Sequence, residues 1–176
     1  MEEIELFNNN RNPEIHTIIF WNGKLDNKIL KRNLNKINIK NKLEILFDKK
    51  FVLSKKKQIE LIESIYIKNK VKINKIYQDT IRLIIIKDFN PIYDLTSSTT
   101  CMQVLNSNMK KLKLLLRKGV GGDKDNFRSV HTSYNIEETI LVLKPLKLEY
   151  FIPRNRFMNF YDFFNTIKSN KKLKYV

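Results

Sequence analysis

The sequence predicts an α+β domain of the ferredoxin-like type, with a split β-α-β arrangement, an antiparallel sheet and helices on one face. Three observations lead to this prediction. Runs rich in β-branched residues alternate with amphipathic helical segments, these segments form two β-α-β units, and 176 residues suffice for one compact domain. A doubly wound parallel sheet is the alternative fold, because the same alternation also fits it.

The first β-α-β unit spans residues 15–53. Residues 15–21 (IHTIIFW) are β-branched and aromatic, which predicts a strand, and Asn22 and Gly23 then turn the chain. Asp26 is a suitable N-cap for a helix with one apolar stripe. The stripe consists of Ile29, Leu30, Leu34 and Ile37. Residues 43–53 (LEILFDKKFVL) predict the second strand.

An additional helix follows this unit. Ser54 is its predicted cap, and Ile59, Ile62, Ile65 and Tyr66 recur at helical spacing. The next stretch, residues 68–75 (KNKVKINK), alternates weakly between charged and apolar residues. It fits an exposed edge strand and a loop equally well.

The second unit begins at residues 81–86 (IRLIII), a β-branched run that predicts a central strand covered on both faces. Asn90 and Pro91 end this strand. A long helix is predicted next, ending at Gly119, and residues 127–131 (FRSVH) predict a short strand. The helix is predicted from its apolar positions Met102, Leu105, Met109, Leu112 and Leu116.

The C-terminal part is predicted to be mainly helical. Asn135 is the expected N-cap of a helix over 136–143, with Glu137 and Glu138 in its first turn, where the helix dipole favours acids. Pro145 and Pro153 bracket an extended connection, after which aromatic residues mark a last helix and residues 173–176 begin a strand. We therefore expect a tail over 1–14, a domain over 15–146 and an extension over 147–176 that leads into a downstream domain.

Composition excludes several classes of protein. The single cysteine, Cys101, rules out an intramolecular disulfide framework. The acidic N-terminus is unlike a secretory signal, and no apolar run approaches the ~20 residues of a membrane span. A cytoplasmic protein without a membrane span is the expectation.

The net charge of +16 raises the question of nucleic-acid binding. The basic residues are 27 Lys and 7 Arg, and they are spread evenly along the chain. They accompany abundant Asn and Ile, the residues that A/T-rich codons encode. A solvated lysine surface is the favoured interpretation. The alternative is a nucleic-acid site at Lys55–Lys57 and Lys68–Lys75.

His131 is the residue whose position in the sequence is most suited to a catalytic role. It ends a predicted strand beside a glycine-rich turn and just before a helix N-terminus. Such a histidine can offer a ring nitrogen to a phosphoryl group whose charge is stabilised by the helix dipole and by Arg117 or Arg128. The alternative is a loop histidine that is hydrogen-bonded to the cap region.

The order of strands and helices, with SVHTS before an acidic helix start, resembles the nucleoside diphosphate kinase family. That family's active-site strand ends in His-Gly-Ser-Asp, and its histidine is the phosphorylated nucleophile. The resemblance spans residues 15–146 and implies this role for His131, with Ser133 at the motif serine, Glu137 at the helix start and Arg117 as a phosphate contact. It also implies a nucleotide accompanied by Mg²⁺.

The sequence departs from the family pattern at several positions. Thr132 replaces the motif glycine, Tyr134 its aspartate, and Arg128 an asparagine expected three residues before the histidine. The lysine expected after the first strand is absent, and the chain between Arg117 and His131 is too short for the family's long loop. Because phosphoryl transfer needs several donors around the same oxygens, these departures predict altered or lost activity.

Other motifs are less informative. Residues 87–100 (KDFNPIYDLTSSTT) fit a ligand-facing loop, and they equally fit a loop that caps the long helix through Ser98 or Thr99. Two histidines and one cysteine without ligand spacing predict no metal site. The segment GVGGD lacks the features of a P-loop or a dinucleotide fingerprint.

Residues 157–176 are similar to the lead-in of nucleotidyltransferase-like proteins associated with surface-polysaccharide synthesis. We therefore expect a nucleotide- or phosphosugar-binding, kinase-like module of a larger, glycan-related enzyme. The alternatives are a basic nucleic-acid-binding module and a non-catalytic structural or partner-binding domain.

Overall fold

The computed structural model describes residues 13–21, 27–41, 43–66, 80–97, 102–119 and 129–152. Its elements in chain order are β1 (Glu14–Phe20), α2 (Asn27–Asn41), β2 (Leu43–Val52), α3 (Lys55–Tyr66), β3 (Thr80–Asp88), β4 (Tyr93–Ser97), β5 (Met102–Asn106), α4 (Ser107–Gly119), β6 (Val130–Thr132), α5 (Ile136–Leu143) and the 3₁₀ helix η4 (Glu149–Phe151). Some predicted features lie outside the described residues, namely those at Asp26, residues 68–75, Ser98, Thr99, Arg128 and residues 153–176.

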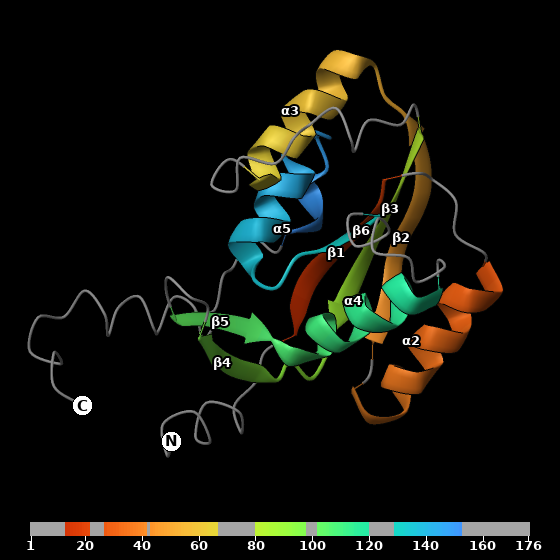
Figure 1. Ribbon diagram of the computed structural model, residues 1–176, viewed down its shortest axis with the longest axis vertical. Coiled ribbons are helices and arrows are strands. Elements are labelled where there is room, and N and C mark those ends of the chain that lie inside the picture. The colour runs from red at the N-terminus through yellow and green to blue at the C-terminus, as the bar shows by residue number, and fades with distance from the viewer. Residues whose placement is uncertain are drawn as a thin grey trace, which may run out of the picture.

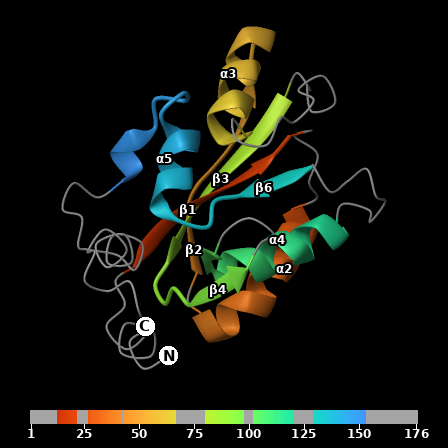
Figure 2. The same ribbon diagram turned by 60° about the vertical axis from the view of Figure 1, so that its left-hand side comes forward.

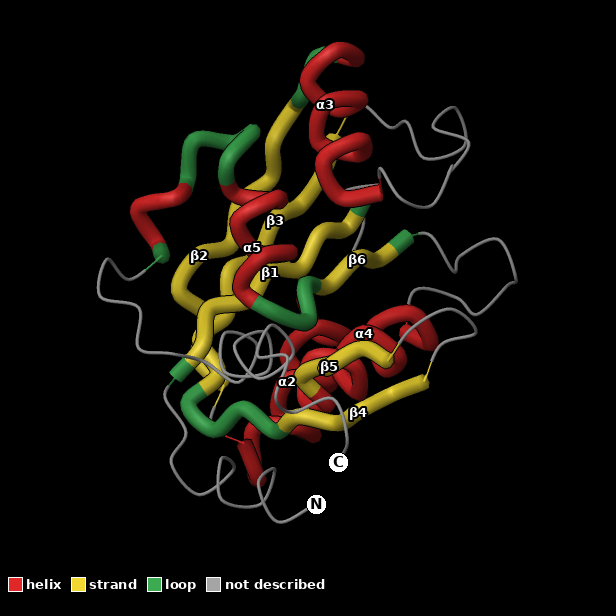
Figure 3. Tube along the Cα trace, turned by 90° about the vertical axis from the view of Figure 1, so that its left-hand side faces the viewer, coloured by secondary structure: helices red, strands yellow, loops and turns green. Residues whose placement is uncertain are grey.

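The main sheet has the strand order β2-β3-β1-β6, and every neighbouring pair is antiparallel. This is the arrangement of a split β-α-β fold, so the predicted ferredoxin-like class is confirmed. β3 lies inside the sheet between β2 and β1, as its β-branched run predicted. β4 and β5 form a separate antiparallel hairpin beside α4 (Figure 3).

The two helices of the β-α-β units, α2 and α4, pack together on one face of the sheet, as predicted. The additional helices α3 and α5 cover the opposite face and contact each other (Figures 1 and 2). The prediction of helices on one face is therefore wrong for α3 and α5. The reason is visible in the sequence: both faces of β1 and β3 carry apolar side chains, and a single helical layer covers only one of them.

Alternation along β1 and β3 divides their side chains between two cores. Ile15 and Ile19 pack with α3 and α5, whereas Ile18 and Phe20 pack with α2 and α4. β3 contributes Ile81, Leu83 and Ile85 to the first core and Ile84 and Ile86 to the second. Each such buried side chain contributes roughly 1.5–3 kcal/mol of transfer free energy, so β1 and β3 hold the layers together.

Two element boundaries differ from the predictions. Residues 102–106 form β5 and not the start of a helix, and α4 begins at Ser107. The connection after Pro145 contains turns and η4 where an extended chain was predicted, and Leu148 and Phe151 fold back onto the α3/α5-side core. The helix over Ile136–Leu143, with its Asn135 cap, is as predicted.

Candidate functional site

The strand that carries His131 lies at an edge of the sheet. β6 pairs only with β1 within the described sheet, through Ile19 opposite His131. The Ser129 carbonyl accepts the Trp21 N–H at 3.0 Å, so the next carbonyl, that of Val130, points away from β1. Arg117 Nη2 of α4 donates to this Val130 carbonyl at 3.1 Å. The guanidinium therefore lies against the open edge of β6, one residue from His131.

His131 is buried, with 5% of its surface exposed. Its Nδ1 and the Tyr66 hydroxyl are 3.2 Å apart, and the two rings meet edge to face with centroids 5.5 Å apart. Its Nε2 has no hydrogen-bond partner among the described residues. Burial, followed by the charges of Lys113 and Arg117, lowers the pKa of His131 to about 3. The imidazole is therefore neutral at physiological pH.

Two cations of α4 lie beside this neutral imidazole. Lys113 and Arg117 are one helical turn apart and share a flank of the helix next to its apolar face. Lys113 Nζ lies 4.6 Å from the centroid of the Tyr134 ring. Burial and the charge of Arg117 lower the pKa of Lys113 to about 8, and burial lowers the pKa of Arg117 as well. The site thus holds two cations in a partly desolvated place, and the charge of the nearby Glu138 opposes the shift at Lys113.

Aromatic rings form the wall of the site. Burial raises the pKa of Tyr66 to about 12 and also raises the pKa of Tyr134, so both hydroxyls stay neutral. Trp21 packs against Tyr66, with ring centroids 6.3 Å apart. We refer to Tyr66, Lys113, Arg117, His131 and Tyr134 as the His131 cluster.

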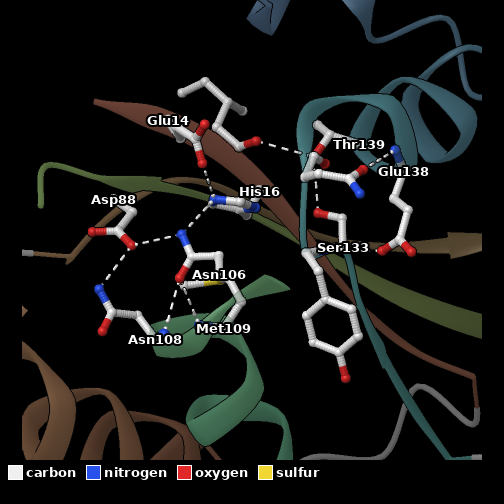
Figure 4. Close-up of polar contacts among 12 residues, drawn as sticks. Glu14, His16, Asp88, Asn106, Asn108, Met109, Ser133, Glu138 and Thr139 are labelled. Atoms are coloured by element: carbon white, nitrogen blue, oxygen red, sulfur yellow. Dashed lines mark hydrogen bonds and ion pairs between the residues drawn. The ribbon is translucent and has the colours of Figure 1, made fainter. Parts of the chain in front are cut away.

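Ser133 lies outside this cluster because its hydroxyl is occupied elsewhere. Its Oγ accepts the Thr17 N–H at 2.8 Å. The same Oγ lies 2.8 Å from Thr139 Oγ1 (Figure 4). Thr139 in turn donates toward the Ile15 carbonyl at 3.0 Å, which ties α5 to β1. In this conformation the Ser133 hydroxyl joins β1 and α5. The structure therefore brings His131 and Arg117 together and leaves Ser133 apart.

Glu137 and Glu138 occupy the first turn of α5 as predicted. Glu138 Oε2 accepts the Tyr134 N–H at 2.8 Å, while its own N–H donates to Asn135 Oδ1 at 2.9 Å. Burial raises the pKa of Glu138. The pattern differs from a capping box, because the carboxylate accepts from the residue before the N-cap, and it holds Tyr134 beside Lys113.

A second polar cluster lies where β1 begins and β3 ends, and the sequence analysis missed it. It consists of Glu14, His16, Asp88, Asn106 and Asn108 (Figure 4). Asn106 Oδ1 accepts the N–H groups of Asn108 and Met109, so Asn106 is the N-cap of α4. The residues of this cluster other than Glu14 are fully buried.

The bonds of Asn106 fix the orientation of its neighbours. Because its Oδ1 is the acceptor, its Nδ2 donates both to Asp88 Oδ2 at 3.1 Å and to His16 Nε2 at 3.0 Å. Asn108 Nδ2 also donates to Asp88 Oδ2, at 3.0 Å. Burial, followed by the charge of Glu14, raises the pKa of nearby Tyr93. The cap of α4 is therefore Asn106, the last residue of β5, and not a residue of the segment 87–100 as one alternative predicted.

Within the residues that the structure covers, no three His, Cys, Asp or Glu side chains are grouped so that they could hold a metal ion. None of the helices in that part of the chain is both long and apolar enough to cross a bilayer. No known protein-family model matches the sequence, and no curated protein matches it significantly.

Tyr66 and Lys113 are the members of the His131 cluster that the sequence analysis missed. Lys113 could have been found, since it precedes Arg117 by four residues and so shares its helix flank. Tyr66 had no such signal, because it approaches His131 only through tertiary packing of α3 on the sheet.

Proposed function

We propose that this chain is a binding module for a phosphorylated small molecule, a nucleotide or a phosphosugar, at the His131 cluster. The observation that supports this most is the placement of Lys113 and Arg117 beside a neutral histidine at the edge of β6. Arg117 lowers the pKa of Lys113, and both cations lower the pKa of His131, so an anion bound beside them would be stabilised by their positive charge. Arg117 offers a planar donor set that suits phosphate oxygens.

Binding is better supported than phosphoryl transfer. In this conformation His131 Nδ1 faces the Tyr66 hydroxyl, and Nε2 is buried. Ser133, the other residue implied by the resemblance, is bonded to Thr17 and Thr139. A ligand phosphate would therefore contact the cations first and reach the imidazole only after local rearrangement.

Phosphoryl transfer to His131 is the second candidate, and the neutrality of the imidazole favours it. A neutral ring keeps the lone pair that a nucleophile needs at physiological pH. Mg²⁺ would then accompany the nucleotide on its phosphate oxygens.

Thermal unfolding with inorganic phosphate, ATP and UDP-glucose, each with and without Mg²⁺, tests the proposal. A ligand present at about 100 times its Kd stabilises the native state by about 2.7 kcal/mol, which raises the Tm measurably. We expect Arg117→Gln to abolish the shift. Lys111→Gln is the matched control, because it removes one charge from an exposed position of the same helix.

The pH dependence of binding provides an independent check. Because Lys113 loses its proton near pH 8, ligand affinity should fall as the pH rises through this value. Lys113→Met should weaken binding and remove that dependence. A set of ligands that leaves Tm unchanged, or an Arg117→Gln protein that binds like the Lys111→Gln control, would disprove the proposal. Phosphohistidine that forms with ATP and is absent in His131→Asn would establish the second candidate.

A further inference from the structure

The opposite edge of the sheet carries a dense basic surface. β2 pairs only with β3 in the described sheet, and Lys49, Lys50 and the three lysines Lys55–Lys57 are all exposed. Between residues 49 and 57 the chain has five lysines and no acidic residue. Asp48, which precedes them, is bonded to Arg82 through Nε–Oδ1 at 2.7 Å. Its charge is therefore already compensated.

Aromatic rings accompany Lys49 on one face of β2, whereas Lys50 lies on the opposite face. Phe47, Lys49 and Phe51 share that face because strand side chains alternate. The Phe47 and Phe51 rings stack with centroids 6.1 Å apart, and Lys49 Nζ lies 5.9 Å from the Phe51 centroid. Phe151 meets Phe47 at 5.4 Å and Tyr150 at 4.7 Å. Tyr150 ends this row of rings, with 72% of its surface exposed.

Helix α3 adds to the positive potential at this edge. Its first turn contains Lys55, Lys56 and Lys57 and no acidic residue. Cations in this position add to the positive end of the helix dipole. Lys49 and Lys55–Lys57, on adjoining elements, therefore form a surface whose charge is complementary to a chain of phosphates.

We propose that this β2 surface, made of Lys49, Lys55–Lys57, Phe51 and Tyr150, binds single-stranded nucleic acid. The lysines neutralise backbone phosphates, and the rings offer faces on which unpaired bases stack. This activity goes beyond the small-ligand site and uses none of the residues of the His131 cluster.

Two other partners fit this surface less well. A second β2 strand would meet lysines and the bulge between Ile45 and Phe47, both of which protect edge strands against pairing. A lipid bilayer would require apolar side chains that can insert. Phe47, Phe51 and Phe151 instead pack against the α3/α5-side core, so their rings stay fixed on the protein.

Fluorescence anisotropy with labelled oligo(dT) and oligo(U) of about 16 nucleotides, measured between about 50 and 200 mM salt, tests the inference. If all four lysines contact phosphates, log K should fall against log salt with a slope of about −2.8. The double variant Lys49→Glu/Lys56→Glu should bind at least about tenfold more weakly and flatten the slope by roughly 1.4. The matched control is Lys110→Glu/Lys111→Glu on α4, which changes the net charge equally. It should retain most of the affinity.

Tyr150→Ala separates stacking from charge and is safe for folding, because this side chain is mostly exposed. We expect affinity to fall several-fold with an unchanged salt slope. Equal losses in the two double-lysine variants would overturn the inference, as would tighter binding of duplex DNA or binding of phosphatidylserine vesicles without binding of oligonucleotides. Arg117→Gln should leave oligonucleotide binding intact, so failure of the phosphate-ligand proposal and failure of this one are distinguishable.

Discussion

The imidazole of His131 is neutral because burial and two neighbouring cations act in the same direction. Desolvation removes the stabilisation that water gives the imidazolium, and Lys113 and Arg117 repel a further positive charge. In the unfolded chain this ring is solvated and titrates near 6.5. The folded and unfolded chains therefore bind different numbers of protons over a wide pH range, which links this residue to stability.

We predict that His131→Asn reduces the acid sensitivity of folding. Between pH 6.5 and 3 the unfolded chain binds a proton at His131 and the folded chain does not, so stability falls as the pH falls through this window. At about 1.4 kcal/mol per pKa unit, the wild-type protein loses a few kcal/mol there. Asparagine cannot titrate, and its amide can still reach the Tyr66 hydroxyl.

Urea unfolding at several pH values between 3.5 and 7 measures this difference, with pH 7 as the reference for each protein. His16 and all carboxylates are present in both proteins, so the difference in slope isolates His131. Parallel curves of unfolding free energy against pH would show that His131 is protonated in the folded protein.

At the scale of elements, the start of α4 shows where periodicity misleads. Met102 and Leu105 continue the helical spacing of Met109 and Leu112, which is why a helix was predicted from residue 102. Two constraints override that spacing. Residues 102–106 pair with β4 in register from Ser97↔Met102 to Tyr93↔Asn106, and the Asn106 side chain caps the next turn. The helix can begin only after its cap.

Asn106→Ala should therefore destabilise the protein more than loss of an ordinary cap. Removing an N-cap costs about 1 kcal/mol, and here Asp88 and His16 would also lose a buried donor, so we expect roughly 2–4 kcal/mol. Asn135→Ala is the matched comparison, since Asn135 caps α5 from a half-buried position and should cost about 1 kcal/mol. Urea unfolding of both variants measures the difference. Equal losses would mean that the polar cluster adds nothing to the cap.

The sequence could predict features that depend on residues close together in the chain, and it could not predict contacts between residues far apart in it. Features of the first kind were predicted. The helix start at Asn135, Glu137 and Glu138 depends on neighbouring residues, and the interior strand over 81–86 depends on the burial of a whole apolar run. The pairing of His16 with Asn106 and of Tyr66 with His131 joins residues 90 and 65 positions apart. No local pattern encodes such contacts, because the sheet order and the helical layers create them.

At the scale of the whole molecule, one sheet serves two cores. Successive side chains of β1 and β3 alternate between the α3/α5-side core and the α2/α4-side core. A strand cannot leave one core without leaving the other, since both sets of side chains are attached to the same backbone. The two helical layers should therefore unfold together and not as separate units.

Leu112→Ala tests this coupling. Leu112 is fully buried in the α2/α4-side core, and its truncation should cost about 2–5 kcal/mol. Trp21, the single tryptophan, lies 2% exposed in the opposite core, so its fluorescence reports on the layer that the substitution does not touch. We expect the urea midpoint from Trp21 fluorescence to fall as far as the midpoint from far-UV circular dichroism. Leu61→Ala, in the α3/α5-side core, is the reciprocal variant and should also shift both signals together. A Trp21 transition that stays at its wild-type midpoint in Leu112→Ala would show that the layers unfold independently and that the sheet does not transmit the loss.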